Sequence, residues 1–431
     1  MTSAAPLLIR HARLAGSSGF STHDLRVKDG RIETLAAGGT LAAEPGEEVI
    51  EADYGLVMPT FVDLHTHLDK GHITPRRANP DGSFKGAFDA VAADRAAHWT
   101  AEDVEARMEF SLRAAYAHGT AAIRTHLDSA PPQHAITWPV FAKVRERWAG
   151  RIDLQAVALC GPDLALDKTV VDEIARTAKH YGGALGGAIS LFDRAEEAIG
   201  NLVEAAGRHG LDLDLHIDES GDPASRSLSV LARTVLDRGF GGRVIAGHCC
   251  SLAIRPEAEV EETLALVAKA GIAVVSLPLC NLFLQDRTPN RTPRWRGVTL
   301  LHELTAAGIA VALASDNTRD PFYAYGDLDM MEVLRESVRI GHLDYPQDHL
   351  AAWFAAVSAV PASLAGFGRH GRIEVGASAD LLLFRARNPG ELFARPQSDR
   401  TIIRAGAIIR PDLPDYRDLD EVLGAQPAHQ R

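Results

Sequence analysis

Residues 61–70 read FVDLHTHLDK. An apolar, strand-like run ends in two histidines, His65 and His67, which lie two positions apart. A strand directs residues i and i+2 to the same side, so both imidazoles are expected to point in one direction. An isolated pair of this kind is weak evidence for a metal site. The pair supports a metal site only if other strands place side chains that can bind a metal beside it.

Short apolar runs recur along the chain, and amphipathic helical stretches separate several of them. The eight runs are VMPTFVDLH, AAIRTHL, DLQAVALC, GGAISLF, DLDLHID, RVIAGHCC, IAVVSLPLC and AVALASD. Strand and helix in alternation indicate right-handed βαβ units, and eight such units predict an α/β fold of the closed (β/α)8, or TIM-type, barrel class. We expect this barrel, as the catalytic domain, at residues 56–371.

The two ends of the chain have a different texture. Residues 1–55 contain short alternating segments with a turn at Asp29-Gly30, and RIEVGASADLLLF and TIIRAGAIIR near the other end are also strand-like. We therefore expect a small β-sandwich domain formed by residues 1–55 and 372–431 together. The polar tail after Pro411 is expected to pack loosely.

Charge and composition exclude several classes of partner. The net charge of −12 and the absence of a Lys/Arg cluster argue against binding to nucleic acid or to a membrane surface. No run of about 18 apolar residues is present, and the first residues lack the layout of a signal peptide. The four cysteines lie in apolar runs without a CxxC motif, which favours reduced thiols and a cytoplasmic location.

Polar residues accumulate where the expected strands end, and barrels of this type hold their active residues at those ends. Besides the first pair, they are His126, His216, Asp218, Glu219, His248, Ser315, Asp316 and Asn317. The imidazoles of His65, His67 and His216 with the carboxylate of Asp316 would give three nitrogen ligands and one oxygen ligand. This set suits one divalent metal ion. A second metal would need a bridging group such as a modified lysine on the fourth strand, and that run contains no lysine.

An ordered set of stretches resembles the amidohydrolase superfamily and, within it, the cytosine deaminase branch. These stretches are HTHLDK at 65, RTHLD at 124, IDLQAVAL at 152, HIDES at 216, GHCCSLA at 247, PLCNLFLQDR at 278 and SDNTRDPFYAYGD at 315. GASADLLLF at 376 resembles the returning β domain of the same superfamily. The chain is similar to the family in this order from about residue 5 to 410.

The resemblance implies a role for each strand-end residue. His65, His67, His216 and Asp316 match the ligands of one divalent metal ion per subunit, zinc or iron. Glu219 matches the residue that carries a proton to a ring nitrogen, and His248 matches the histidine that contacts the attacking water and the developing charge. Asp316 would also accept the proton of the water. Barrels of this family often oligomerise, so we expect a homo-oligomer.

The chain departs from the cytosine deaminase pattern at the end of the third strand. Cys160 and Gly161 lie where a Pro-Gln pair is expected, so the amide that holds the pyrimidine is missing. Asn317 replaces a second aspartate, and the aromatic residue of the segment that follows is Phe322. We expect these four residues and His126 to bind substrate. The departures put cytosine itself in doubt, and glycine leaves room for a larger ring.

The sequence therefore predicts a metal-dependent hydrolytic deaminase of an amino-substituted nitrogen heterocycle, which is cytosine-like, a pterin or a triazine. A small-molecule ring is the expected partner, and ammonia the expected product. The same mononuclear site could instead cleave an alkylamine C–N bond or a cyclic amide. A catalytically inactive scaffold is disfavoured because all six expected site positions are occupied. Lys70 lies either at the mouth of the site or in solvent.

Overall fold

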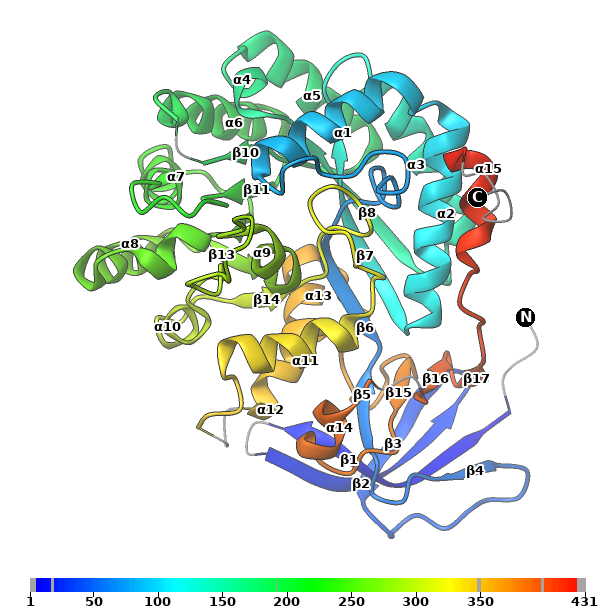
Figure 1. The fold of residues 1–431 in the computed structure, drawn as a ribbon. Coiled ribbons are helices and arrows are strands. Elements are labelled where there is room, and N and C mark those ends of the chain that lie inside the picture. Colours follow the sequence, from blue (N-terminus) through cyan, green and yellow to red (C-terminus); the bar gives the residue numbers. More distant parts are fainter. Residues whose placement is uncertain (1–4, 17–18, 191, 347–349, 397–398, 425–431) are drawn as a thin grey trace. The chain divides into compact units, whose positions relative to one another are not determined.

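The computed structural model describes residues 5–16, 19–190, 192–346, 350–396 and 399–424. The chain divides into two compact units and contains two large sheets (Figure 1). Unit 1 comprises Met1–Asp63, Ala115–Ala122 and Asp329–Leu413, and unit 2 comprises Leu64–Ala114, Ile123–Leu328 and Pro414–Arg431. The outer limits of the domains expected from the sequence, Met1 and Arg431, lie outside the described residues.

One sheet is a nearly closed parallel barrel. Its strands are β6 (Phe61–Thr66), β7 (Thr120–Asp128), β8 (Asp153–Leu159), β9 (Ala184–Leu185), β10 (Ala188–Ile189), β11 (Leu213–Ile217), β12 (Val244–His248), β13 (Ala273–Ser276) and β14 (Val311–Leu313). They pair in the order β14-β13-β12-β11-β9-β8-β7-β6, and β10 adds to β11. A parallel bridge between Thr66 and Asp316 joins the first strand to the last, and the Asp316 N–H donates to the His65 carbonyl at 2.9 Å. The expected (β/α)8 barrel is confirmed.

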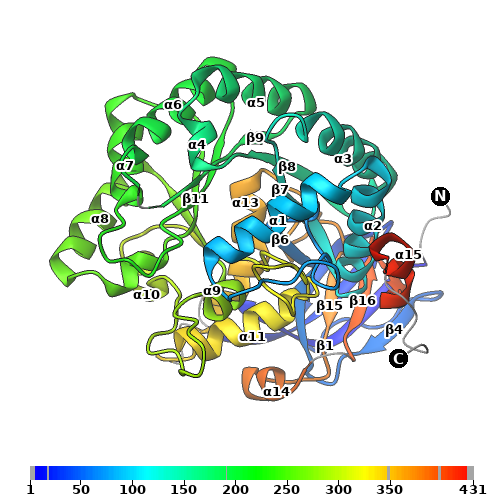
Figure 2. The ribbon, with the colours of Figure 1, turned by 45° about the horizontal axis from the view of Figure 1, so that its top comes forward.

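Helices follow the barrel strands as the alternating pattern predicts. They are α1 (Phe84–His98), α2 (Ala101–Ala117), α3 (His134–Trp148), α4 (Pro162–Ala165), α5 (Lys168–Tyr181), α6 (Ala195–His209), α7 (Ser227–Asp237), η1 (Cys250–Ile254), α8 (Glu257–Ala270), α9 (Pro278–Leu284) and α10 (Leu301–Ala306). In Figure 2, α3, α5, α6, α7 and α8 lie in an outer arc around the strands.

Helix α5 shows how local sequence sets these elements. The side chain of Asp167 caps its start by accepting from the Thr169 and Val170 N–H groups, and Gly182 ends it with a φ of 70°. Its buried residues recur at the i, i+3, i+4 and i+7 spacing of one helix face: Val171, Ile174, Ala175 and Ala178. This face packs toward β8 and β9. The helix therefore owes its position to an apolar stripe between two good caps.

The other sheet is built from both ends of the chain, as expected. Its strands are β1 (Leu7–Gly16), β2 (Gly19–Lys28), β3 (Arg31–Ala37), β4 (Glu48–Glu51), β5 (Leu56–Pro59), β15 (Leu381–Leu383), β16 (Thr401–Arg404) and β17 (Ala407–Ile409). They pair in the order β17-β16-β15-β5-β1-β2-β3, and β4 pairs with β1. Its helices are α11 (Met330–Gly341), α12 (Leu350–Trp353), η3 (Phe354–Val357), α13 (Ala359–Ala365) and α14 (Pro389–Ala394).

The predicted turn at Asp29-Gly30 is confirmed. Lys28 pairs with Arg31, and the two residues between them have φ values of 49° and 76°. Two positive φ angles in succession characterise the type I′ turn that joins two antiparallel strands with the correct twist. Aspartate tolerates the first position and glycine the second, which explains why this pair connects β2 to β3.

The first apolar run of the sequence, residues 57–65, is not one strand. It divides at Thr60 into β5, which pairs with β15 and β1, and β6, which begins the barrel. Pro59 ends β5 and has no N–H to donate to a ladder, so the chain can leave one sheet there and enter the next. The expected single strand is therefore wrong, although its end still carries the two histidines.

The tail after Pro411, as far as the structure describes it (residues 412–424), does not pack loosely. It forms η4 (Tyr416–Leu419) and α15 (Asp420–Leu423), and Leu419 is buried. The Tyr416 ring stacks on Phe110 with centroids 5.5 Å apart, and its hydroxyl donates to Asp327 Oδ1 at 2.9 Å. One aromatic ring and one leucine thus anchor a segment whose polar composition had indicated otherwise.

Arg107 of α2 fixes the segment that follows β6. Its guanidinium is fully buried and donates to Asp103 Oδ2 at 2.9 and 2.7 Å, and to the carbonyl oxygens of Asp69 and Gly71. Asp103 also accepts from Arg76, which lies in the same segment. A buried charge is tolerated only with such partners, so the arginine and its acceptors depend on one another.

Replacing Arg107 with leucine is expected to lower the apparent free energy of unfolding by about 3 to 5 kcal/mol, because buried acceptors lose their donor. Urea denaturation followed by circular dichroism measures this loss. Arg113→Leu on the same helix is the control: its side chain is 44% exposed and pairs with Asp418 at the surface. That pair is worth less than about 1 kcal/mol. Equal losses in the two variants would contradict the role given to Arg107.

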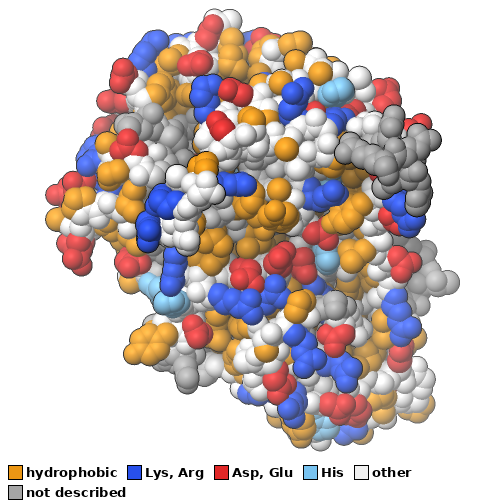
Figure 3. Space-filling view, viewed as in Figure 1, with side chains coloured by type: hydrophobic (Ala, Val, Ile, Leu, Met, Phe, Trp, Pro, Cys, Tyr) orange, Lys and Arg blue, Asp and Glu red, His pale blue; other side chains and the backbone are white. Residues whose placement is uncertain are grey.

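Two further features are the distribution of charge on the surface and the character of the helices. Acidic and basic side chains are mixed over the face drawn in Figure 3. Among the helices that the structure describes, none combines the length and apolar character needed to cross a lipid bilayer.

Candidate functional site

The four side chains expected to hold a metal converge at one end of the barrel. The Nε2 atom of His216 lies 3.1 Å from Nε2 of His65 and 3.1 Å from Nε2 of His67. Asp316 Oδ1 lies 3.2 Å from Nε2 of His67 and 3.7 Å from Nε2 of His65. The first two histidines come from the end of β6, the third from β11, and the aspartate follows β14. The sheet thus assembles residues that are up to about 250 positions apart in the chain.

These distances fit donor atoms around a single ion. Two nitrogen atoms that each lie about 2.1 Å from one metal are about 3.0 to 3.4 Å apart, depending on the coordination angle. All four side chains are almost completely buried. Burial lowers the pKa of His65, His67 and His216 well below the ordinary value, so their imidazoles stay neutral with a lone pair available. The site therefore fits a mononuclear divalent metal ion.

His126, expected to bind substrate, lies beside the ligands rather than along the cavity. Its ring centroid is 4.0 Å from that of His65, and its Nε2 is 3.6 Å from Asp214 Oδ1. Ligand atoms of His65, His126 and His216 can all fall within 4.8 Å of one another, as can those of His65, His248 and Asp316. His126 is fully buried and does not line the cavity described below, so its expected contact with substrate has no support in its position.

Glu219 and His248 lie next to each other on the cavity wall. His248 Nδ1 is 3.4 Å from Glu219 Oε1. Burial raises the pKa of Glu219 well above its ordinary value, and the charge of Asp316 raises it further, so this carboxyl group can keep a proton. Burial lowers the pKa of His248 to about 3. Two neighbouring groups with pKa values shifted apart are suited to different proton-transfer roles.

Asn281 is a member of this cluster that the sequence did not reveal. It lies on α9, is fully buried, and its Nδ2 is 3.3 Å from Glu219 Oε1 and 3.0 Å from His248 Nδ1. It belongs to PLCNLFLQDR, one of the stretches that resemble the family, but an asparagine in an apolar helix carries no chemical signal by itself. Only the fold brings it against two residues of other loops.

Asp218 has a structural task. Its carboxylate accepts from the Ser227 N–H at 2.9 Å, the Leu228 N–H at 3.0 Å and the Ser225 hydroxyl at 2.6 Å. These bonds satisfy the first N–H groups of α7. Although Asp218 is one of the polar residues at the strand ends, its carboxylate is thus engaged at the start of α7.

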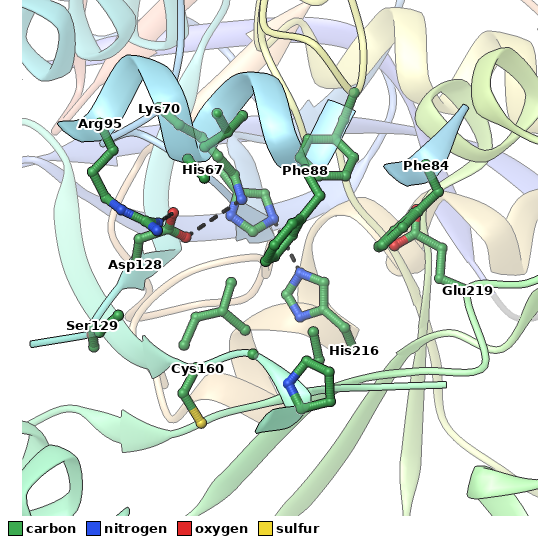
Figure 4. Close-up of a pocket in the computed structure, with 18 of the residues that line it drawn as sticks. His67, Lys70, Phe84, Phe88, Arg95, Asp128, Ser129, Cys160, His216 and Glu219 are labelled. Carbon is green, nitrogen blue, oxygen red and sulfur yellow. Dashed lines mark hydrogen bonds and ion pairs between the residues drawn. The ribbon is translucent and has the colours of Figure 1, made fainter. Parts of the chain in front are cut away.

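A cavity of about 360 Å³ opens beside the cluster (Figure 4). Three of the proposed ligands line it, together with Glu219 and His248: His67, His216 and Asp316. Four of the residues expected to bind substrate line it: Cys160, Gly161, Asn317 and Phe322. No atom lies within 4 Å of the position that a Cβ would take on Gly161, so the space left by this glycine is open.

Lys70 is buried at this cavity and is not solvated. Its Nζ lies 3.6 Å from Asp128 Oδ1 and 5.2 Å from the centre of the Phe322 ring. Arg95 of α1 also binds Asp128, through Oδ2 at 2.6 Å. Burial would lower the pKa of Lys70, but the charges of Asp128 and Asp69 raise it above the ordinary value. The cavity therefore has a fixed positive charge beside the Phe322 ring.

Helix α1 supplies the apolar wall, which the sequence did not predict. Phe84 and Phe88 point from the helix toward the cavity in Figure 4 and are 41% and 49% exposed. The Phe84 ring meets Phe322 edge to face, with centroids 5.4 Å apart. The i, i+4 spacing of two phenylalanines on an alanine-rich helix is the one signal that could have indicated this wall.

Comparison with known proteins identifies the family of the chain. The model of the amidohydrolase family matches residues 173–409. A pterin deaminase of Rhizobium rhizogenes is 55% identical over 411 residues, which are 95% of this chain and 92% of the relative. An N-isopropylammelide isopropyl amidohydrolase of a Pseudomonas species is 27% identical over 94% of this chain and 97% of its own.

A solved structure extends the likeness to three dimensions. The 5-methylcytosine deaminase of Klebsiella pneumoniae, liganded with 5-fluorocytosine, superposes with a TM-score of 0.82 at 28% identity, covering 95% of this chain and 98% of that one. The resemblance found in the sequence is thereby confirmed, and the chain belongs to the amidohydrolase family.

Proposed function

We propose that this protein removes the amino group from a bicyclic pterin-class ring by hydrolysis and releases ammonia. Deamination of a nitrogen heterocycle is the activity of the family branch to which the chain is similar. The observation that carries it is the position of Glu219, a buried carboxyl group with a raised pKa, on the same cavity as the four-donor cluster. The pterin class is supported by the relative with 55% identity over most of both chains.

The donor set limits the metal. Three imidazole nitrogens and one carboxylate oxygen suit zinc and iron, whereas magnesium and calcium prefer oxygen ligands alone. We propose one zinc or iron ion held by His65, His67, His216 and Asp316. When bound, such an ion lowers the pKa of water so that water can attack at neutral pH. Metal analysis of the purified protein identifies the element.

The side chains of the chain then move protons. Glu219 hands its proton to the ring nitrogen beside the amino-bearing carbon, which makes this carbon electrophilic. Asp316 takes a proton from the attacking water, and the Nε2–H of His248 stabilises the charge that develops on oxygen. A carbon–oxygen bond forms, and Asp316 passes the proton that it took from water to the amino group. The carbon–nitrogen bond then breaks, ammonia leaves, and the proton of the added hydroxyl returns to Glu219 as the carbonyl forms.

The cavity offers features for holding a flat, bicyclic ring. Phe88 and Phe84 present half-exposed aromatic faces, which a stacked ring would cover. The Lys70 ammonium has donors to spare beyond its contact with Asp128, so it suits an oxygen substituent of the ring. The open space at Gly161 removes the barrier that a glutamine side chain would raise against a second ring.

A second candidate reaction uses the same groups. The relative from Pseudomonas, named for removing an isopropyl amine, spans 94% of this chain, so hydrolysis of an alkylamine C–N bond stays open. Opening of a cyclic amide belongs to the same alternative. Only the leaving group separates these reactions from deamination.

Ammonia release by the metal-loaded protein tests the proposal. The panel is cytosine, isocytosine, creatinine, aminotriazines, isoguanine and pterins, with N-alkylated aminotriazines and cyclic amides added. Ammonia and ring product in equal amounts from a pterin would support the proposal. Release of alkylamine or ring opening without ammonia, by a protein with its metal bound, would favour the alternative.

Replacing Gly161 with glutamine is expected to lower kcat/KM for a pterin by about 10- to 100-fold, because the new side chain fills space needed by the second ring. The value for cytosine is expected to fall less or to rise. Steady-state kinetics on both rings give the ratio of kcat/KM for the pterin to kcat/KM for cytosine. Gly241→Gln is the control, since a Cβ there also meets no atom within 4 Å and lies away from the cavity. An unchanged ratio in Gly161→Gln would refute the size argument.

A further inference from the structure

Asn281 joins two residues whose roles depend on where their protons lie. It sits in the helix that follows β13, whereas Glu219 follows β11 and His248 is the last residue of β12. Its amide nitrogen is within hydrogen-bond distance of both, at 3.3 Å from Glu219 Oε1 and 3.0 Å from His248 Nδ1. All three side chains are buried, at 0%, 8% and 1% exposed respectively, so water does not compete for these contacts.

The amide presents its nitrogen to these partners. With the proton of Glu219 on Oε2, Oε1 is an acceptor, and an amide turned over would place its own oxygen against it. An amide NH2 group has two hydrogens and no lone pair to offer. One hydrogen goes to Glu219 Oε1, and the other goes to His248 Nδ1.

The second hydrogen bond determines the tautomer of His248. If Nδ1 accepts a hydrogen, it carries none, and the neutral imidazole must carry its proton on Nε2. Nε2 is buried and has no hydrogen-bond partner among the described residues, while His248 lines the cavity. The hydrogen on Nε2 is therefore available to the reacting oxygen.

A competing arrangement exists within the same cluster. His248 Nδ1 lies 3.4 Å from Glu219 Oε1, so the opposite tautomer could donate directly to that carboxylate. Nε2 would then have no hydrogen, and His248 could accept but not donate in the cavity. The two arrangements exclude each other, and the Asn281 contact is the shorter of the two.

We propose that Asn281 is a positioning residue that selects the Nε2–H tautomer of His248 and holds Oε1 of Glu219. The interpretation of its effect on turnover rests on the proposed deaminase function. The tautomer itself can be observed without any substrate, so the two ideas can fail separately.

Asn281→Asp is the sharpest variant, because it keeps the shape and replaces the donor by an acceptor. The carboxylate accepts Nδ1–H, which reverses the tautomer, and it can no longer donate to Glu219 Oε1. We expect kcat to fall by about a hundredfold or more with KM changed by less than about threefold and metal content unchanged. Asn281→Leu, which removes the donor without adding charge, is expected to lower kcat by about 10- to 100-fold.

Two controls separate positioning from a general loss of structure. Asn290→Asp makes the same amide-to-carboxylate change at an exposed position beyond the same helix, outside the cavity lining, and should keep kcat within about threefold of wild type. In a His248→Ala background, Asn281→Leu should cost less than it does in the wild type, because one of its two partners is already gone. Full, multiplied losses in the double variant would overturn the proposal.

Nitrogen NMR of zinc-loaded protein labelled with [15N]histidine gives the decisive reading. The His248 signals are assigned by their loss in His248→Gln. We expect a bare Nδ1 and a protonated Nε2 in the wild type and the reverse in Asn281→Asp. A protonated Nδ1 in the wild type would overturn the proposal whatever the substrate. If the wild type shows the expected tautomer but releases no ammonia from any ring, the proposed function is contradicted and the tautomer assignment stands.

Discussion

Replacing His216 with alanine is expected to weaken metal binding by more than about a hundredfold and to abolish turnover. Loss of a partner that merely orients a ligand costs about 10- to 100-fold in metal affinity, and loss of a ligand atom costs more. His216 is the central donor, because its Nε2 lies 3.1 Å from those of both His65 and His67. Without it, two nitrogens and one carboxylate remain around an enlarged space.

Metal content after dialysis against a chelator measures this effect, together with circular dichroism to show that the barrel is folded. His180→Ala is the control, because this histidine is exposed on α5 and does not belong to the donor cluster. Full metal occupancy in His216→Ala would break the ligand assignment.

A second pair of variants tests which histidines complete the set. His126 can bring a ring nitrogen within 4.8 Å of ligand atoms of His65 and His216, so it competes with His67 for the role of third nitrogen donor. His67 lies on the cavity and within 3.2 Å of Asp316 Oδ1, whereas His126 has Asp214 beside its Nε2. We therefore expect His67→Ala to lose the metal and His126→Ala to keep it. The opposite result would move the site deeper into the barrel.

The sequence was sufficient to predict the barrel and the converging donors, because both follow from periodicity. Alternation of strand and helix places every strand end on one rim, and a polar residue after an apolar run then points to the site. The division of the fourth strand could not be predicted. In the fourth strand, a Cβ on Gly186 would lie 2.6 Å from Val157 Cγ1, and one on Gly187 would lie 2.7 Å from Leu202 Cδ1. These glycines allow close packing and divide the strand into β9 and β10, which no apolar pattern indicates.

Residues that act through neighbours were beyond the reach of the sequence. No spacing in the sequence indicates the roles of Asn281, Asp128 and Arg95. The partners of each lie on elements that are distant in the chain. Lys70 could be placed near the site but not inside it, since its burial depends on Asp128 at the end of β7 and on Phe322 in the segment after β14. Long-range contacts of this kind appear only when the barrel has closed.

Glu219→Gln is expected to lower kcat by about a hundredfold or more while metal content stays at the wild-type level. Glutamine has nearly the shape of the protonated acid and the same charge, and its Oε1 can still accept from Asn281 Nδ2. What it lacks is a proton that it can transfer to the ring nitrogen. A hundredfold loss corresponds to about 2.7 kcal/mol of transition-state stabilisation, within the range of one general acid.

The measurement is kcat, KM and metal content of Glu219→Gln beside those of Glu303→Gln, an exposed position on α10 that should behave as wild type. Because burial and the charge of Asp316 both raise the pKa of Glu219, the wild-type group is poised to give up its proton only when the substrate offers a basic nitrogen. Unchanged turnover would remove Glu219 from the reaction. Loss of metal together with turnover would instead make it a ligand, and the proton would then have to come from another group on the cavity.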